Sequence, residues 1–130
     1  MKKPGVLVVA GDRGPGREVC SLVQELDYAA TLIQSLQDLE PELRKDPQVA
    51  VILDLDTMPV TNQFLRGLRK THPQFHLLGI SELAYHPGLE EVIGSYLLAC
   101  LVKPLDVEEL CFWLRSITEH LSNPEEKTEG

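Results

Sequence analysis

Short apolar runs alternate with amphipathic segments along almost the whole chain. The apolar runs are rich in branched side chains and occupy residues 6–10, 29–33, 49–53, 75–80 and 99–102. The amphipathic segments carry leucine and valine at helical spacing over residues 16–27, 36–44, 63–70, 89–97 and 107–121. Strands that alternate with helices in this way predict a parallel sheet covered on both faces. We therefore predict an α/β fold, with a doubly wound parallel sheet of five strands in a single domain.

Length and charge narrow the possible functions. The chain has 130 residues and a net charge of −8, which argues against a general nucleic-acid binder because such a protein needs a basic surface. No apolar run approaches the roughly 20 residues of a membrane span, and the amino-terminal apolar run is too short for a signal peptide. We expect a soluble cytoplasmic domain over residues 1–121 and a polar tail over residues 122–130.

The three cysteines, Cys20, Cys100 and Cys111, lie in apolar surroundings. Their number is odd and their spacing does not match a metal site, so we expect buried, reduced thiols. The four histidines are scattered and lack a matched acid or thiol at catalytic spacing. We therefore expect surface histidines or histidines whose hydrogen bonds are satisfied. We also expect that the chain is not an enzyme.

Polar residues follow the predicted strands at the edge where this class of sheet binds ligands. In doubly wound sheets that edge is formed by the carboxyl ends of the strands, at the point where the strand order reverses. The residues placed there are Asp12, Asp54, Ser81 and Lys103. Lys103 precedes Pro104, and a residue before proline is held near extended geometry, so this cation is kept at the rim of the sheet.

The order of these features resembles the receiver domains of response regulators, over about residues 4–121. That family has a phosphoacceptor aspartate and a Met-Pro turn after the third strand, a hydroxyl residue after the fourth, and Lys-Pro after the fifth. The corresponding residues here are Asp54 with Met58-Pro59, Ser81, and Lys103-Pro104. The resemblance implies a flavodoxin-like (βα)5 fold and a role in two-component phosphorelay signalling. It also implies that Asp54 accepts phosphate, Lys103 offsets its charge and Ser81 hydrogen-bonds it.

The metal site of the family is changed in this sequence. Its first strand ends in a pair of acidic residues that hold Mg²⁺, whereas this chain has Ala10 and Gly11, with Asp12 one place later. Mg²⁺ takes one or two protein carboxylates plus waters, and Asp12 and Asp54 can supply two. The loss of the acidic pair nevertheless predicts a weak or absent Mg²⁺ site.

The spacing around the acceptor is changed as well. Counting back from Met58-Pro59 by the family spacing places the acceptor at Leu55, so Asp54 is one residue too early and Asp56 one too late. Asp54 and Asp56 share an orientation only if the strand continues, because side chains alternate along a strand. Asp54 ends the apolar run directly, and we choose it as the candidate acceptor.

Three functions remain open. The first is a receiver domain that accepts phosphate on Asp54 from a histidine kinase, which the retained aspartate, serine and lysine favour. The second is a phosphorylation-independent pseudo-receiver that binds other proteins, which the missing acidic pair favours. A flavodoxin-like domain for a small ligand is a weaker third. We predict a receiver domain with a degenerate acidic site, whose partner is a histidine kinase or another signalling protein, or a second copy in a homodimer, and neither nucleic acid nor membrane.

Overall fold

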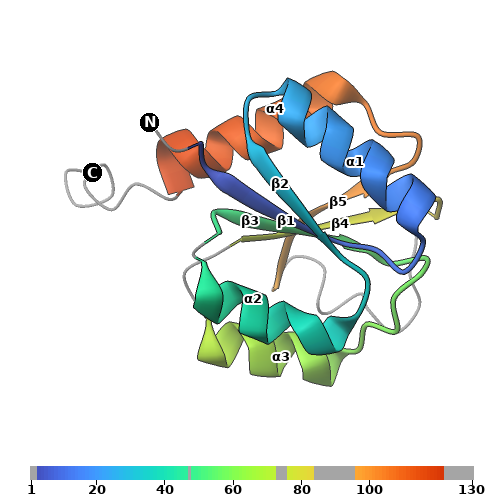
Figure 1. The fold of residues 1–130 in the computed structure, drawn as a ribbon, viewed down its shortest axis with the longest axis vertical. Coiled ribbons are helices and arrows are strands. Elements are labelled where there is room, and N and C mark those ends of the chain that lie inside the picture. Colours follow the sequence, from blue (N-terminus) through green and yellow to red (C-terminus); the bar gives the residue numbers. More distant parts are fainter. Residues whose placement is uncertain (1–2, 47, 73–75, 84–95, 122–130) are drawn as a thin grey trace.

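The computed structural model describes residues 3–46, 48–72, 76–83 and 96–121 (Figure 1). The strands are β1 (Gly5–Val9), β2 (Ala29–Ile33), β3 (Ala50–Asp54), β4 (His76–Ser81) and β5 (Leu97–Val102). They form one parallel sheet of five strands in the order β2-β1-β3-β4-β5. The strand order reverses between β1 and β3, as the flavodoxin-like prediction requires, and the predicted fold class is confirmed.

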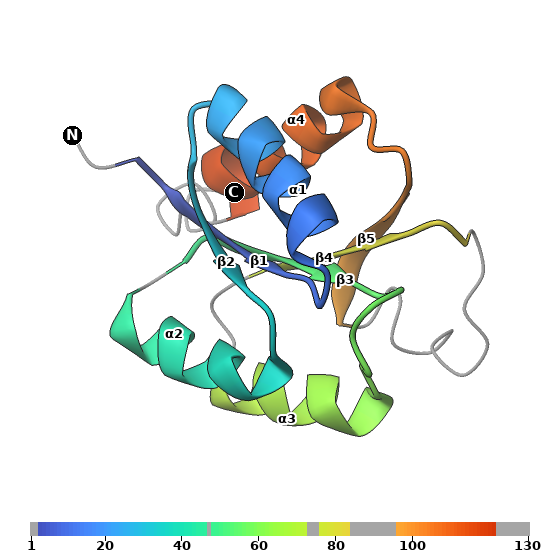
Figure 2. The same ribbon diagram turned by 45° about the vertical axis from the view of Figure 1, so that its right-hand side comes forward.

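Helices cover both faces of this sheet. They are α1 (Arg13–Glu25), the 3₁₀ turn η1 (Leu36–Asp38), α2 (Leu39–Lys45), α3 (Asn62–Thr71), α4 (Val107–Ser116) and the π-helical turn η2 (Ile117–Leu121). Helices α1 and α4 lie on one side of the sheet, and α2 and α3 lie on the other (Figures 1 and 2). Each side has its own hydrophobic core.

The two cores divide the residues of the central strands by alternation. In β1, Val6 and Val8 belong to the core beneath α1 and α4, whereas Leu7 and Val9 belong to the core above α2 and α3. Every residue of β3 is buried. This explains why the central strands are continuous apolar runs, because a parallel strand with helices on both faces has no solvent side.

The ends of α1 differ from the predicted range of 16–27. The helix begins three residues earlier, at Arg13, and Pro15 is its third residue, where a missing N–H costs nothing. It ends at Glu25 because Asp27 has a φ of 73°, which no helix continues. The N–H of Asp27 donates to the carbonyl of Gln24 (3.0 Å) and that of Tyr28 to the carbonyl of Val23 (3.2 Å), which is a Schellman ending.

The other boundaries differ from the prediction for local reasons. Pro41 is the third residue of α2, so it lies in the first turn and is tolerated there. Thr61 caps α3 by accepting from the N–H of Phe64 (3.1 Å), which places the helix start at Asn62. The predicted helix over 89–97 falls mostly on residues outside the described part of the chain. Its last residue was predicted wrongly, because Leu97 begins β5. The predicted tail over 122–130 also lies outside the described residues.

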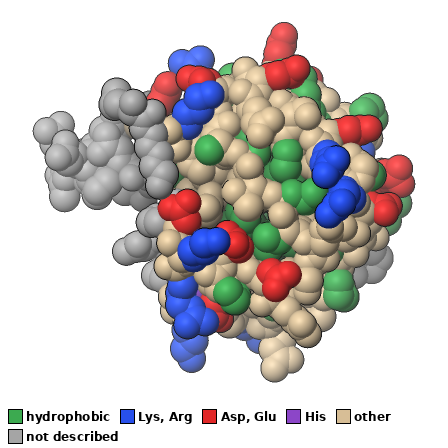
Figure 3. Space-filling model, viewed as in Figure 1, with side chains coloured by type: hydrophobic (Ala, Val, Ile, Leu, Met, Phe, Trp, Pro, Cys, Tyr) green, Lys and Arg blue, Asp and Glu red, His purple; other side chains and the backbone are tan. Residues whose placement is uncertain are grey.

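The surface carries mixed charge. On the face shown in Figure 3, acidic and basic side chains are interspersed. One of the ion pairs within a helix joins Arg44 to Glu40 (2.9 Å), and both side chains are exposed, so it adds only about 0.3–0.5 kcal/mol. None of the helices in the described part of the chain has both the length and the apolar character that a membrane span requires.

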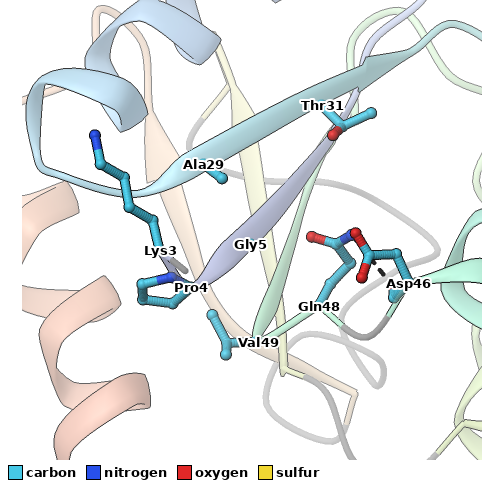
Figure 4. Close-up of a pocket in the computed structure, with 8 residues that line it drawn as sticks. All are labelled: Lys3, Pro4, Gly5, Ala29, Thr31, Asp46, Gln48 and Val49. Atoms are coloured by element: carbon cyan, nitrogen blue, oxygen red, sulfur yellow. Dashed lines mark hydrogen bonds between the residues drawn. The ribbon is translucent and has the colours of Figure 1, made fainter. Parts of the chain in front are cut away.

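A cavity lies at the amino ends of β1, β2 and β3 (Figure 4). Its lining residues are Lys3, Pro4, Gly5, Ala29, Thr31, Asp46, Gln48 and Val49. In a parallel sheet this edge is opposite the carboxyl ends of the strands, where ligands of doubly wound folds bind. The candidate site described next is therefore separate from this cavity.

Candidate functional site

The sheet brings three predicted site residues to one edge. Asp54 is the last residue of β3, Ser81 is the last residue of β4, and Lys103 directly follows β5. The backbone N–H of Lys103 donates to the carbonyl of Ser81 (2.8 Å), and the peptide bond between Lys103 and Pro104 is cis. The backbone hydrogen bond to Ser81 holds the Cα of Lys103 next to β4.

The Lys103 ammonium group lies between two carboxyl groups. Its Nζ is 3.0 Å from Asp54 Oδ1 and 3.0 Å from Asp56 Oδ2. The Asp54 side chain is 1% exposed, whereas those of Lys103 and Asp56 are 22% and 21% exposed. Lys103 therefore contacts the aspartate at the end of β3, and a second carboxylate shares the same cation.

Asp56 has several hydrogen-bond partners at this edge. Its Oδ1 accepts from the hydroxyl of Ser81 (2.6 Å), and its Oδ2 accepts from the backbone N–H of Glu82 (2.8 Å) as well as from Lys103. Its own N–H donates to Asp54 Oδ1 (3.0 Å). Ser81 is therefore linked to the other residues through Asp56 and not through Asp54, and the four side chains of Asp54, Asp56, Ser81 and Lys103 form one cluster.

Sequence reasoning considered Asp56 and chose Asp54 over it, so the contacts of Asp56 were missed. The sequence did contain a signal for Asp56. Asp54 and Asp56 lie on either side of Leu55, the position at which the family spacing places the acceptor. The family pattern offered no reason to expect both carboxyl groups on one lysine. The roles assigned to Asp54, Ser81 and Lys103 stay predictions.

The contacts of Asp56 and Lys103 favour the charged forms of these two side chains. Burial raises the pKa of the Asp56 carboxyl, but the hydrogen bonds from Ser81 and Glu82 and the charge of Lys103 together bring that pKa below its usual value. Burial lowers the pKa of Lys103, but its bonds to Asp54 and Asp56 outweigh this effect, so that pKa lies above its usual value. Asp56 and Lys103 are therefore an ion pair over the physiological range.

The Ser81 hydroxyl is engaged on both sides. Its side chain is fully buried, it donates to Asp56, and its Oγ accepts from the N–H of Leu83 (2.9 Å). A buried hydroxyl held by two partners is an ordered donor.

At Gly11, the second position of the family's acidic pair, another part of the chain approaches closely. A Cβ added to Gly11 would lie 2.8 Å from the carbonyl oxygen of Thr57, closer than real Cβ atoms approach. The N–H of Gly11 donates to Thr57 Oγ1 (2.9 Å), so the loop after β3 is held directly on the loop after β1. No side chain fits at position 11 while these two loops touch.

The residues present do not fit a Mg²⁺ site of the family's kind. Asp12 is exposed at the start of α1, and its side chain does not cap that helix. Among the described residues, no group of three or more His, Cys, Asp or Glu side chains is placed to hold a metal ion. One oxygen of Asp54, the other predicted ligand, already accepts from Lys103 and from the N–H of Asp56.

A cavity of about 250 Å³ adjoins the cluster on the side of α1. Its lining residues are Pro15, Glu18, Val19, Leu22, Asp54, Ile80, Lys103, Pro104 and Leu105. Most of this lining is aliphatic, and its charged side chains are those of Glu18, Asp54 and Lys103. The cavity belongs to the same edge of the sheet.

The cysteines form no disulfide and are half-buried, somewhat more open than the buried thiols that the sequence predicts. Burial raises the pKa of the Cys20 and Cys100 thiols, and the negative charge of Asp56 raises that of Cys100 further. A raised pKa keeps these thiols protonated and weakly nucleophilic.

Comparisons with known proteins match this chain by structure alone. No protein-family model and no curated protein matches it. A response regulator receiver domain (CheY-like) from Methylobacillus flagellatus superposes with a TM-score of 0.76 and 21% identity, covering 89% of this chain and 99% of that one. The signal receiver domain of an HD domain-containing protein from Pseudomonas fluorescens gives 0.79 at 18% identity, covering 92% and 97%.

A pilus assembly-related protein from Burkholderia pseudomallei also matches, with a TM-score of 0.75 and 17% identity, covering 88% of this chain and 89% of that one. At such identities the comparison reports backbone architecture and leaves the chemistry of the site open. The sheet order, the helix placement and these superpositions agree, and the chain has the fold of response regulator receiver domains.

Proposed function

We propose that this chain is a receiver-type signalling module that docks onto other proteins of a two-component pathway without being phosphorylated. The observation that carries this proposal is the contact between Gly11 and Thr57. Phosphoryl transfer to a carboxylate brings two anions together and depends on electrostatic stabilisation, much of which the family obtains from its acidic pair and Mg²⁺. In this chain Ala10 and Gly11 stand at the positions of that pair, and Gly11 contacts the loop after β3.

The burial of Asp54 supports the same proposal. An acceptor carboxylate must present an oxygen in line with the leaving group of the donor, and the Asp54 side chain is 1% exposed. One of its oxygens already accepts from Lys103 and from the N–H of Asp56. These contacts of Asp54 link the end of β3 to the loop that follows it and to Lys103, which follows β5.

Phosphorylation of Asp54 is the second candidate. It is favoured by the position of Asp54 at the carboxyl end of β3 and by its distance of 3.0 Å to Lys103. A histidine kinase would then be the partner, whereas the docking proposal admits any signalling protein that recognises the surface of the fold.

The experiment that separates the two is phosphorylation by a small acyl phosphate in the presence of Mg²⁺, read by intact mass. A receiver domain that has the acidic pair is treated in parallel, so that the donor is known to be active. We expect no phosphoryl adduct on the wild-type chain, as on the Asp54→Asn variant. An adduct on the wild-type chain that is missing from Asp54→Asn would overturn the docking proposal in favour of phosphorylation.

A further inference from the structure

Three hydrogen-bond donors converge on the carboxylate of Asp56. They are the hydroxyl of Ser81 (2.6 Å), the backbone N–H of Glu82 (2.8 Å) and the ammonium group of Lys103 (3.0 Å). Both carboxylate oxygens are used, since Oδ1 takes the hydroxyl and Oδ2 takes the other two donors. A hydroxyl, an amide and an ammonium group aimed at one anion form a site that is specific for oxyanions.

The sheet places these donors independently of Asp56. Ser81 is the last residue of β4, and its hydroxyl is oriented by the N–H of Leu83 (2.9 Å). Lys103 is fixed through its backbone bond to Ser81 (2.8 Å) and through its side-chain bond to Asp54 (3.0 Å). The donors therefore belong to the strand ends, whereas the anion comes from the loop that follows β3.

That loop is held at successive residues. Besides Asp56, the hydroxyl of Thr57 accepts from the N–H of Gly11 (2.9 Å), and the N–H of Met58 donates to the carbonyl of Asp54 (3.2 Å). The Asp56 bonds link the loop to β4 and β5, and the Thr57 bond links it to the end of β1. Together, Asp56 and Thr57 thereby join the loop after β3 to the ends of β1, β4 and β5.

We propose that Asp56 is the resident ligand of an oxyanion site in this chain, an internal carboxylate that occupies the donors of Ser81, Glu82 and Lys103. A free tetrahedral oxyanion such as inorganic phosphate binds these donors when the carboxylate is removed and is excluded while it is present. The inference deepens the proposed function, on which it rests for its biological meaning, because it gives the physical reason why the cleft keeps one state without phosphorylation.

The test uses the amide signals of Glu82 and Leu83 in ¹⁵N-labelled protein during titration with inorganic phosphate at constant ionic strength. In the Asp56→Ala variant we expect a saturable shift of these signals, with phosphate bound at least about 10-fold tighter than by the wild-type chain. Lys103→Met in the Asp56→Ala background should abolish the shift. Asp56→Ala protein that binds phosphate no better than wild type would overturn the inference.

A matched control removes charge from the same edge without touching the donors. Asp12 is exposed and lies just beyond β1, so Asp12→Ala lowers the local negative charge by the same amount. We expect Asp12→Ala to leave phosphate binding at the wild-type level. An equal gain in Asp12→Ala and Asp56→Ala would overturn the inference, since reduced charge repulsion would then explain both.

The wild-type chain provides a measurement that does not depend on a variant folding. The Glu82 amide, bound to Asp56, should exchange with solvent at least about 10-fold slower than in an unstructured peptide of the same sequence. Exchange at the peptide rate would overturn the inference. Phosphorylation of Asp54 would overturn the proposed function and leave the Glu82 and phosphate results standing, so the two failures can be told apart.

Discussion

At the scale of single residues, the close approach of the loops after β1 and β3 determines which side chains fit at the carboxyl edge of the sheet. Gly11 and Thr57 touch through a hydrogen bond of 2.9 Å, and the missing side chain of Gly11 is what allows it. Glycine is used at such positions because a Cβ would collide with the neighbouring backbone. The same contact removes the room for a metal-binding carboxylate.

We predict that restoring an acid at this position will not restore a metal site. In Gly11→Asp the new Cβ would lie 2.8 Å from the Thr57 carbonyl oxygen, so the loop must move, at a cost of about 1–3 kcal/mol in the free energy of unfolding. Urea unfolding with and without Mg²⁺ measures both effects. A variant as stable as wild type, or one that Mg²⁺ stabilises strongly, would show that the loop yields easily.

Gly14 serves as the control for this substitution. A Cβ added to Gly14 meets nothing within 4 Å, although Gly14 lies only three residues further along the same loop and helix start. Gly14→Asp should change the free energy of unfolding by less than about 0.5 kcal/mol, as for an ordinary surface substitution. The difference between the two variants isolates the effect of the close approach.

At the scale of the elements, the end of α1 shows how a single backbone angle determines a boundary. Asp27 has a φ of 73°, where a side chain is unfavourable, and the Schellman bonds of Asp27 and Tyr28 hold it there. Helical spacing continues through Leu26 in the sequence, so the periodicity alone extended the helix to residue 27. The left-handed residue is invisible to periodicity, because here it is an aspartate and not the usual glycine.

We predict that Asp27→Gly will stabilise the protein. Glycine adopts positive φ without steric cost, which should raise the free energy of unfolding by about 1 kcal/mol. The substitution removes the contact of Asp27 with Lys3 (3.3 Å), but the exposed fractions of these side chains are 85% and 56%, and such a pair contributes little. Thermal unfolding should show a rise in Tm.

Asp27→Ala is the matched variant, because it removes the same contact with Lys3 and keeps a Cβ at positive φ. We expect Asp27→Ala to be no more stable than wild type. Equal stability of the glycine and alanine variants would contradict the conformational explanation.

At the scale of the whole molecule, the pairing of charges at one edge makes the stability depend on pH. The pKa of Asp56 is lowered in the folded state by Ser81, Glu82 and Lys103, against the opposing effect of burial. The folded state therefore binds fewer protons than the unfolded state in acid, and this contribution to stability is present above the ordinary pKa of aspartate, roughly 3.9. It is lost as the pH falls through the folded pKa of Asp56.

The comparison that measures this contribution is urea unfolding of wild type and Asp56→Asn at a series of pH values. The difference in free energy of unfolding should be largest near neutral pH and should shrink as the pH falls below about 4. The raised pKa of Lys103 has the opposite pH dependence. Its contribution to the free energy of unfolding is present below roughly pH 10.4 and is lost at higher pH. A difference that stays constant from neutral to acid pH would contradict the assignment to Asp56.

How much of the structure the sequence predicts also differs between the fold and the side-chain contacts. The five apolar runs predicted the sheet because buried parallel strands have a composition and length of their own. The edge occupied by Asp54, Ser81 and Lys103 followed from the topology alone. The sequence did not predict which side chains pair with each other. The loop is one residue longer than the family spacing, so either Asp54 or Asp56 could have lain against Lys103. Only the path of the backbone shows that both reach it.

The Asp56 carboxylate has a consequence for how such a protein is controlled. Its bonds to Ser81, Glu82 and Lys103 form when the chain folds and need no group added afterwards. In the proposed function, a docking module whose internal anion is always in place carries information through the number of copies present. Its cellular abundance is therefore the quantity that a signalling experiment should follow.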